Sequence, residues 1–474
     1  MADMSYEKQA DYERQWLFPP SLESLLPMDH PARMVREFVD ALDLKALGFK
    51  ERRGDDGRPS YAASLMLKVW LYGYMTKVRS TRGLERACRD SMGMLWLTGM
   101  NRPDHTSLWR FWDTNQEGIR KQFRQLLKMA VKLNLVEMVL HAVDGTKIFS
   151  QASEWKGWHR STLEENLKKV ETAIAEIMKQ TAEKVGEKNG ESGLPEDLQE
   201  RQQLRAKIEE QLKQLDEIDR DHKLEGDPEA RMMKCRKGTH FAYNAQAVVD
   251  EATGVIVAAD VVNEESDNHQ LAPMLEQVEE NLGRVADQTV ADNGYMALTE
   301  LAKVEEKQYP VLVNLTEQQK EQEEGYAASR FEYDAEKDCC VCPQGQRLEF
   351  DGMKKREKAE TYEVRVYRCQ SYETCPVRWQ CSSSKTGRTV QIHPNHASLV
   401  RQRIKQRDPA MRAMLKKRGA TIEPVFGWSK IVMGLQRWSV RGKEKVRTQW
   451  ILQCTALNLL RLYGRWSEGK FAFE

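Results

Sequence analysis

Two short apolar runs, each followed by an aspartate, constrain the fold of this chain more than any other feature of its sequence. Residues 138–143 form the first run and lead into Asp144 and Gly145, and residues 289–291 lead into Asp292 and the turn-forming pair Asn293–Gly294. Apolar runs of this length that stop at glycine-containing turns are typical of buried strands. We therefore predict two buried strands, with Asp144 and Asp292 at their ends.

A third carboxylate, Glu423, lies in the most basic stretch of the chain. Residues 401–447 contain 14 Lys and Arg against three acids, although the formal net charge of all 474 residues is only +1. A charge excess this one-sided, with Trp428 and Trp438 interleaved, indicates a surface that binds nucleic-acid phosphates. The alternative is a solvated helix face, which is the more common origin of such runs.

A chain of 474 residues is too long for one hydrophobic core, so two or three domains are expected. Residues 21–125 show helical apolar spacing, and their short helices, with a basic and aromatic third member that opens at residues 108–112, resemble a helix-turn-helix module. In the alternative interpretation, Trp109 and Trp112 belong to the core of this helical domain. No apolar run approaches the roughly 18 residues of a membrane span, and the polar N-terminus lacks a signal peptide, which predicts a cytoplasmic protein without membrane contact.

The middle of the sequence alternates between charged helical segments and strands. Residues 161–185 and 195–222 predict two helices, separated by a break at residues 186–193, that form an antiparallel hairpin. This hairpin would bind DNA or a partner subunit, or would be a solvated coiled coil. Apolar runs and periodicity further predict strands at 241–249, 254–262 and 309–315 and a helix at 271–282.

These elements together predict an α/β protein with a ribonuclease-H-like mixed sheet. Three antiparallel strands would be followed by helix-linked parallel strands, which is the pattern of that sheet. We expect an all-helical N-terminal DNA-binding domain at residues 1–130 and a catalytic domain at residues 131–474. The helical hairpin, residues 153–235, and a cysteine-rich segment, residues 325–395, would be insertions that interrupt the catalytic domain.

Six of the nine cysteines crowd into one segment, between residues 339 and 381. Because thiols stay reduced in the cytosol, this clustering favours a metal site over disulfides. Four thiolates would suit a structural Zn²⁺ site, for which the sequence offers Cys342, Cys369, Cys375 and Cys381. Cys339 and Cys340 compete for the same role, and the alternative is a set of reduced cysteines packed in a small sheet.

The three carboxylates suit the cleavage of a DNA phosphodiester, or its joining to a 3′-hydroxyl. Two Mg²⁺ ions about 3.5–4 Å apart would activate the attacking oxygen and relieve charge at the leaving oxygen. Asp144 would bridge both ions, with Asp292 and Glu423 completing one side each, because Mg²⁺ prefers a few carboxylates to a full protein cage. Taken singly, an aspartate before glycine is more often a turn residue, so this interpretation needs all three carboxylates.

Cations around Glu423 are predicted to hold the DNA. Pro424 belongs in the first turn of a helix, which would place Glu423 near the helix N-terminus and Lys430 two turns later on the same face. Lys430 would then hold a phosphate against the metal ions, with Arg418 and Lys417 acting from the other side. The remaining predicted DNA-binding residues of this basic stretch are Arg437 and Arg441.

Several segments resemble the motifs of one known family. The first acidic motif is Val143-Asp144-Gly145-Thr146-Lys147, the second is Ala291-Asp292-Asn293-Gly294-Tyr295, and the third covers residues 422–430. Further likeness lies in residues 26–33, 58–61, 71–74, 227–231 and 243–246. The chain thereby resembles the DDE transposases of bacterial insertion sequences that have a helical N-terminal domain and a ribonuclease-H-like core.

This resemblance implies Mg²⁺-dependent strand cleavage and strand transfer, acting on the terminal inverted repeats of the protein's own element and on target DNA, both double-stranded. It also implies a homodimer on DNA. The third motif departs from the wider family, in which a Tyr and an Arg often precede the Glu, because this chain has Lys416 and Gly419 there. Two rivals stay open: a nuclease that hydrolyses DNA without strand transfer, and a copy that only binds DNA and represses.

Overall fold

The computed structural model describes residues 21–50, 60–185, 196–235, 238–317, 319–320, 322, 324–357 and 361–473. The chain divides into two compact units, one combining residues 1–126 with 455–474 and the other spanning residues 127–454. The predicted break at 186–193 and the first two residues of the 58–61 motif lie outside the described residues. No helix in the described ranges is long and apolar enough to cross a membrane.

The first unit is built from helices, as predicted for residues 21–125. They are α1 (Pro31–Asp40), α2 (Ala63–Met75), α3 (Thr81–Asp90), α4 (Met92–Thr98), α5 (His105–Thr114) and parts of α6 (Gln116–Lys132) and α14 (Lys443–Ser467). Trp112 is 1 % exposed and belongs to the core, whereas Trp109, stacked on it, is 36 % exposed. We did not predict that residues 455–474 would join these helices.

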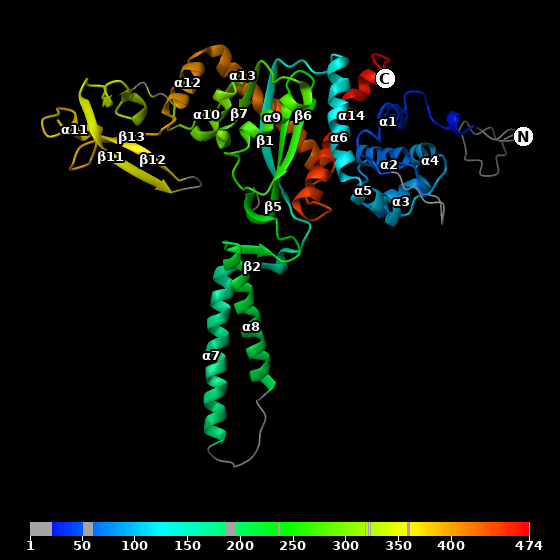
Figure 1. Cartoon of the computed structure of the whole chain (residues 1–474), viewed down its shortest axis with the longest axis horizontal. Coiled ribbons are helices and arrows are strands. Elements are labelled where there is room, and N and C mark those ends of the chain that lie inside the picture. The colour runs from blue at the N-terminus through cyan, green and yellow to red at the C-terminus, as the bar shows by residue number, and fades with distance from the viewer. Residues whose placement is uncertain are drawn as a thin grey trace, which may run out of the picture. The chain divides into compact units, whose positions relative to one another are not determined.

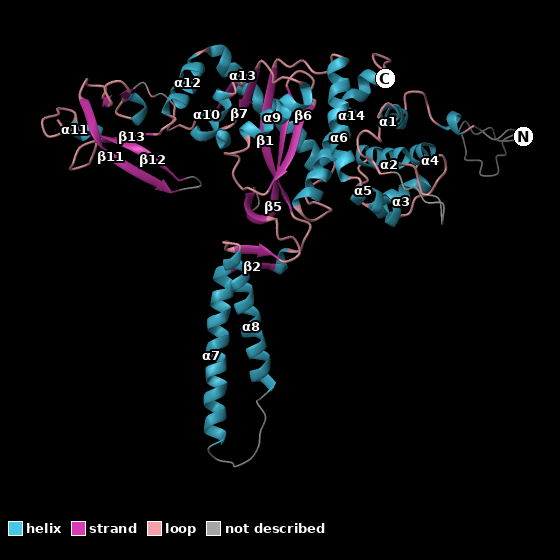
Figure 2. Cartoon of the chain, viewed as in Figure 1, coloured by secondary structure: helices cyan, strands magenta, loops and turns pink. Residues whose placement is uncertain are grey.

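The second unit centres on a six-stranded mixed sheet (Figures 1 and 2). Its strands are β1 (Leu140–Phe149), β4 (Arg231–Cys235), β5 (Gly238–Asp250), β6 (Ile256–Val262), β7 (Gln288–Ala291) and β8 (Val311–Val313). β5 is antiparallel to β1, β4 and β6, whereas β7 is parallel to β1 and β8. Helices α9 (Leu271–Leu282) and α10 (Leu298–Glu306) precede and follow β7. The predicted pattern of antiparallel strands followed by helix-linked parallel strands is confirmed.

Apolar residues that are buried on both faces form the centre of this sheet. Val143, Val248, Val290 and Leu312 are all 0 % exposed, as expected for strands covered on both sides. β1 does not end at Asp144 as predicted but continues to Phe149, because residues 145–149 stay paired with residues 242–246 of β5. β7 does end directly before Asp292, as predicted.

Two long helices lie between β1 and β4 in the sequence and pack as an antiparallel pair, α7 (Arg160–Val185) and α8 (Glu196–Glu217) (Figure 2). At their base, β2 (Gly157–His159) pairs with β3 (His222–Leu224). We call residues 157–224 the arm. The second helix was predicted to reach residue 222 but ends at 217, because the chain turns there to pair as β3. The arm has its own apolar core of Leu163, Val170, Ile174, Leu198, Ile208 and Leu215.

The cysteine-rich segment forms a second, antiparallel sheet of order β13-β12-β11-β10-β9. Its strands are β9 (Glu332–Asp334), β10 (Cys339–Val341), β11 (Arg347–Glu357), β12 (Thr361–Cys369) and β13 (Thr389–Ile392), with the short helix α11 (Arg378–Cys381) before β13. Phe331, Cys340, Leu348, Tyr367 and Val390 form its core. The cysteine-rich part of the chain therefore forms a small sheet with its own core.

The basic stretch folds as α12 (His396–Arg407), α13 (Pro409–Gly427) and one π-helical turn, Trp428–Val432. The prediction that Pro424 opens a helix is wrong, since Pro424 lies inside α13. The helix begins fifteen residues earlier in sequence number, at Pro409, where the Asp408 carboxylate caps the N–H of Ala410. Asp followed by Pro supplies both a side-chain cap and a first residue without an N–H to satisfy, which makes it the stronger start signal.

Candidate active site

Asp144 and Asp292 come together because their strands are parallel neighbours. Ala142 of β1 lies opposite Val290 of β7, so two residues further along each chain the register places Asp144 beside Asp292. The Asp144 side chain is 18 % exposed. Asp292 caps the 3-10 helix Asn293–Tyr295 by accepting the Gly294 N–H at 2.8 Å. Two carboxylates thus share one edge of the sheet.

The charge of Asp144 is disfavoured by its surroundings. Burial raises the pKa of Asp144, and the neighbouring charge of Asp292 acts in the same direction. The Arg418 guanidinium opposes this shift: its Nη1 lies 2.8 Å from Asp144 Oδ2 in an ion pair whose two side chains are 19 % and 18 % exposed. One cation therefore balances two adjacent carboxylates.

Lys430 also contacts β1. Its ammonium donates to Thr146 Oγ1 at 2.6 Å and to the Lys147 carbonyl oxygen at 2.8 Å. Thr146 and Asp144 are two residues apart on one strand, so their side chains point to the same face of the sheet. Arg418 and Lys430 therefore bring positive charge to the face that carries Asp144.

Glu423, the third predicted carboxylate, is exposed on α13, a helix that packs on β1 and β7. Its side chain leans toward Gly419, where an added Cβ would lie 3.2 Å from Glu423 Oε1. Among the described residues, no group of three or more His, Cys, Asp or Glu side chains is arranged to hold a metal ion. The structure therefore brings together two of the three predicted carboxylates.

The other predicted DNA-binding residues contact the chain itself. Lys417 forms an ion pair with Glu251 at 3.1 Å. Arg437 donates to the Ser150 carbonyl oxygen and lies over the Phe149 ring, 5.7 Å from its centroid. Arg441 donates to Gln151 Oε1 at 2.8 Å. Because all three side chains are also exposed, these contacts leave them accessible to a ligand.

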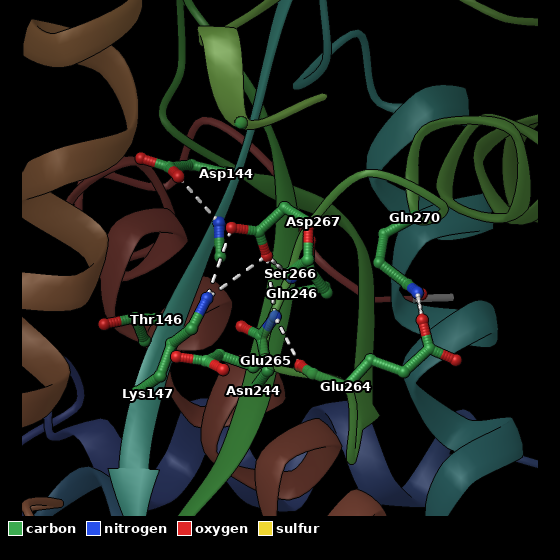
Figure 3. Close-up of polar contacts among 12 residues, drawn as sticks. Asp144, Thr146, Lys147, Asn244, Gln246, Glu264, Glu265, Ser266, Asp267 and Gln270 are labelled. Carbon is green, nitrogen blue, oxygen red and sulfur yellow. Dashed lines mark hydrogen bonds and ion pairs between the residues drawn. The ribbon is translucent and has the colours of Figure 1, made fainter. Parts of the chain in front are cut away.

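Sequence reasoning missed Asp267, in the loop between β6 and α9. Figure 3 shows its carboxylate at the centre of a polar network with Lys147 of β1 and Asn244 and Gln246 of β5. A signal was present: Asn244 and Gln246 interrupt the predicted apolar strand 241–249, and both are 0 % exposed. Buried amides need hydrogen-bond partners, so a polar residue elsewhere had to meet them.

The four cysteines predicted to bind zinc line one small cavity of about 20 Å³. The Cys342 sulfur accepts backbone N–H groups of Gln344 and Gln346, both at 3.3 Å. Burial raises the pKa of the Cys369 and Cys381 thiols, and the other thiols of the cluster act in the same direction. The competing cysteines are buried in β10 and do not line this cavity: Cys339 and Cys340.

Comparisons with known proteins give two matches to family models. A model described as a Transposase DDE domain matches residues 341–463, and a Transposase domain (DUF772) matches residues 20–114. The first range includes Glu423, Lys430 and the four cysteines, whereas Asp144 and Asp292 lie outside both ranges. No curated protein and no solved structure matches the chain.

Proposed function

The chain is a DDE-type transposase of the insertion-sequence class, and we propose that Asp144, Asp292 and Glu423 carry its chemistry on DNA. The observation that supports this most is the pairing of Asp144 with Asp292 on adjacent parallel strands, on which the helix bearing Glu423 packs. A DDE domain implies a ribonuclease-H-like core, and the strand order β6-β5-β1-β7-β8 is compatible with one.

Divalent metal ions suit the donor chemistry of this site. Two carboxylates in a partly buried setting repel each other and are balanced by one guanidinium, so a further cation is favoured there. We propose that the three carboxylates hold two Mg²⁺ ions, which when bound would activate the attacking oxygen and relieve charge at the leaving oxygen. Arg418 and Lys430 would contribute by holding DNA phosphate on the same face of β1.

Glu423 fits this role because it is exposed and uncommitted. No residue of the described chain forms a hydrogen bond or ion pair with its carboxylate, and the carboxylate lies beside Gly419, one turn before it. A wider side chain at position 419 would contact the Glu423 carboxylate, since even a Cβ would lie 3.2 Å from it. The glycine that departs from the family pattern therefore leaves the proposed third ligand room to move.

The proposed organisation assigns DNA binding to both ends of the chain. Residues 1–130 would form the DNA-binding domain and residues 131–474 the catalytic domain, with insertions at 153–235 and 325–395. The exposed cations of α13 and its C-terminal extension would line the DNA: Lys417, Arg437 and Arg441. Because two element ends are joined in one reaction, we propose that the protein acts as a homodimer on the terminal inverted repeats and the target DNA.

The test is cleavage of DNA that carries the ends of the element, in Mg²⁺, by wild type and by Asp144→Ala, Asp292→Ala and Glu423→Ala. We expect wild type to cut and each variant to bind the ends but to lose cleavage by at least about 10³-fold. Glu444→Ala is the matched control, because Glu444 is an exposed helical glutamate in the same basic stretch. Cleavage by a triad variant at the control rate would refute that residue's role.

The same assay separates the two rivals. When a 3′-hydroxyl end and a supercoiled target are supplied, strand transfer would produce joined molecules, whereas a nuclease would produce only hydrolysed ends. A protein that protects the element ends from a probe nuclease, but never cuts them in Mg²⁺ or Mn²⁺, would instead be a DNA-binding repressor.

We further propose a structural Zn²⁺ ion held by Cys342, Cys369, Cys375 and Cys381. The four cysteines line one small cavity of about 20 Å³, large enough for one water-sized species, and a bound ion would require the four side chains to rearrange toward it, because they do not form a metal site as they lie among the described residues. N–H donors to Cys342 would stabilise its thiolate. Such an ion would tie together the turn after β10, the end of β12 and the segment around α11, which carry the four cysteines.

The zinc proposal is tested by metal analysis of the purified protein. We expect close to one zinc per chain for wild type and for the control Cys235→Ser, and loss of zinc with a lower melting temperature for Cys342→Ser and Cys369→Ser. Wild-type protein that contains no zinc and does not gain stability when zinc is added would contradict the assignment.

A further inference from the structure

We propose that Asp267 is a positioning residue that fixes the strand backbone carrying Asp144 and, through Tyr295, the turn carrying Asp292. This inference depends on the proposed function only in taking these two aspartates as metal ligands. Asp267 lies in the loop between β6 and α9, and its carboxylate is 17 % exposed. It lies outside all three acidic motifs of the sequence.

The network of Asp267 occupies the face of the sheet opposite to the Asp144 side chain. In the β1–β5 ladder, Gly145 pairs with Gln246 and Lys147 pairs with Asn244. Directly paired residues, and residues two apart on a strand, share a face, so these four positions lie on one face of the sheet. Asp144 and Thr146 alternate with them and therefore point to the other face. Figure 3 shows this division: Lys147 points toward Asp267, whereas Asp144 and Thr146 point away from it.

Asp267 accepts several hydrogen bonds at close range. Its Oδ1 accepts Asn244 Nδ2–H and Gln246 Nε2–H, each at 2.6 Å. The Lys147 ammonium lies 3.4 Å from Oδ1 and 3.2 Å from Oδ2, and its side chain is also 17 % exposed. A partly buried carboxylate needs such pairing, and removing either charge leaves the other without compensation. The network is therefore held in one arrangement.

The space beside Gly145 is filled by this network, which therefore contacts the backbone next to Asp144. A Cβ at position 145 would lie 2.3 Å from Gln246 Nε2, 2.6 Å from Asp267 Oδ1 and 2.8 Å from Asn244 Oδ1. Contacts this short do not occur in folded proteins, so the polar groups fill the space of a side chain. The same peptide orients Asp144, because the Gly145 N–H donates to Asp144 Oδ1 at 2.7 Å.

The network also reaches the turn of the second aspartate. Tyr295 is 0 % exposed, and its hydroxyl donates to Gln246 Oε1, the other end of the amide held by Asp267. A Cβ at Gly294, the residue whose N–H donates to Asp292 Oδ1, would lie 3.6 Å from Asp267 Oδ2. One partly buried carboxylate thus braces both the strand segment of Asp144 and the turn of Asp292, whose side chains would share metal ions, and such a site tolerates displacements of only about 0.5 Å.

A direct role as a metal ligand is less consistent with the geometry. Oδ1 of Asp267 already accepts two amide N–H groups and contacts the Lys147 ammonium. Its face of the sheet is the one away from Asp144, Arg418 and Lys430. Asp267 would therefore act through the backbone of Gly145 and the Gln246 amide.

The test measures Mn²⁺ affinity of the full chain without DNA, by electron paramagnetic resonance of the free ion, together with the Mg²⁺ concentration that gives half-maximal cleavage. We expect Asp267→Asn to weaken Mn²⁺ binding, and to raise the half-maximal Mg²⁺ concentration, by about 10-fold or more, as for residues that orient metal ligands. Binding of the element ends should change less than about twofold.

The matched control is Asp260→Asn. Asp260 is a partly buried aspartate of the neighbouring β6, 25 % exposed, paired with Arg447 at 2.7 Å. Its replacement removes a comparable carboxylate charge elsewhere in the sheet and should leave Mn²⁺ affinity unchanged. Equal Mn²⁺ affinities for Asp267→Asn, Asp260→Asn and wild type would overturn the proposal.

A second variant keeps the test decisive if Asp267→Asn does not fold. Gly145→Ala leaves both Asp267 and Lys147 in the chain but inserts a methyl group into the network, which displaces the Asp267 carboxylate, so it should weaken Mn²⁺ binding to a similar degree. Unchanged affinity in Gly145→Ala would refute the bracing role. Wild type that binds Mn²⁺ but does not cut DNA would contradict the proposed function and leave the effect of Asp267 measurable, whereas wild type that binds no Mn²⁺ would overturn both.

Discussion

At the scale of single residues, the charged form of Asp144 is less stable in the folded protein than in the unfolded chain. Its pKa is raised because burial disfavours the carboxylate, with the charge of Asp292 adding to the effect and Arg418 only partly compensating. An acid whose pKa is higher in the folded than in the unfolded state binds its proton more tightly when folded. Its contribution to stability is therefore greatest at low pH and is lost as the pH rises through the raised pKa.

Asp144→Asn should consequently stabilise the metal-free protein at neutral pH. The asparagine oxygen can still accept a hydrogen bond from Arg418, while the unfavourable charge is removed. Melting temperatures in a chelator between pH 4 and pH 8 measure this effect, and the advantage of the variant should grow as the pH rises. A wild type that is the more stable protein across this range would contradict the electrostatic account of the site.

Gly73 is a residue whose replacement should destabilise the first unit, although it lies inside α2. A Cβ there would lie 2.2 Å from Leu84 Cδ2 and 2.9 Å from the Val78 carbonyl oxygen, so Gly73→Ala should cost about 1–3 kcal/mol through overpacking. Gly464→Ala is the control, since nothing lies within 4 Å of its added Cβ in α14 and helix propensity alone predicts a gain of about 0.5–1 kcal/mol. Urea unfolding should show opposite signs for the two variants.

At the scale of elements, the helix starts show what a single sequence can and cannot reveal. Both Pro409 and Pro424 were available as first residues of a helix, and only Pro409 follows a capping aspartate. Pro424 lies in the last turn of α13, just before the π-helical turn, and because proline has no N–H it cannot form the helical hydrogen bond to the Ala420 carbonyl oxygen. The capping rule alone predicts the helix start at Pro409, after Asp408. Pro424 was predicted instead because it follows Glu423, the expected metal ligand.

The cap of α5 leads to a prediction for a whole helix. Asp104 Oδ1 accepts the N–H groups of Thr106 and Ser107 at 2.9 Å each, and Oδ2 accepts the Ser107 hydroxyl at 2.9 Å. Asp104→Ala should destabilise the first unit by about 1 kcal/mol, whereas Asp104→Ser should cost much less. Chemical unfolding of the three proteins measures this difference, and equal losses for both variants would exclude capping as the cause.

The pH dependence of this cap has the opposite sign to that of Asp144. Hydrogen bonds from the backbone and side chain of Ser107 lower the pKa of Asp104, so its stabilisation is present above the ordinary carboxyl pKa and is lost as the pH falls through the lowered value. The stability difference between wild type and Asp104→Ala should therefore shrink toward pH 3.

At the scale of the whole molecule, the sequence predicted the parts that depend on periodicity. The strands, their parallel or antiparallel pattern and the helical pair of the arm follow from apolar spacing, and the pairing of Asp144 with Asp292 follows from the β1–β7 register. Two features depend on packing between distant segments and left no periodic signal: the joining of residues 455–474 to the first unit, and the position of Glu423 relative to the sheet. Asp267 could not be predicted for the same reason, because its hydrogen-bond partners are on β1 and β5, which are distant from it in the sequence.

The arm offers a test of how independently the parts of the second unit fold. The buried residues of its apolar core come from α7 and α8, such as Leu163 and Leu215, and Trp158 of β2 packs against them. β2 and β3 pair with His159 opposite His222. Because the two strand ends already face each other, replacing residues 160–221 by a short Asn-Gly turn should close a β-hairpin without strain. We expect the shortened protein to keep the melting transition of the remaining structure within about 2 °C of wild type.

The control is a variant with Leu215→Asp, which places a charge in the arm core without removing the arm. It should lose arm helicity, measured by far-ultraviolet circular dichroism, while near-ultraviolet signals from buried tryptophans such as Trp438 and Trp450 stay unchanged. If both variants keep metal-dependent cleavage of element ends, the arm acts after cleavage or on a partner subunit. A fall of many degrees in the melting transition of the shortened protein would show that the arm core also stabilises the mixed sheet, contrary to its separate packing.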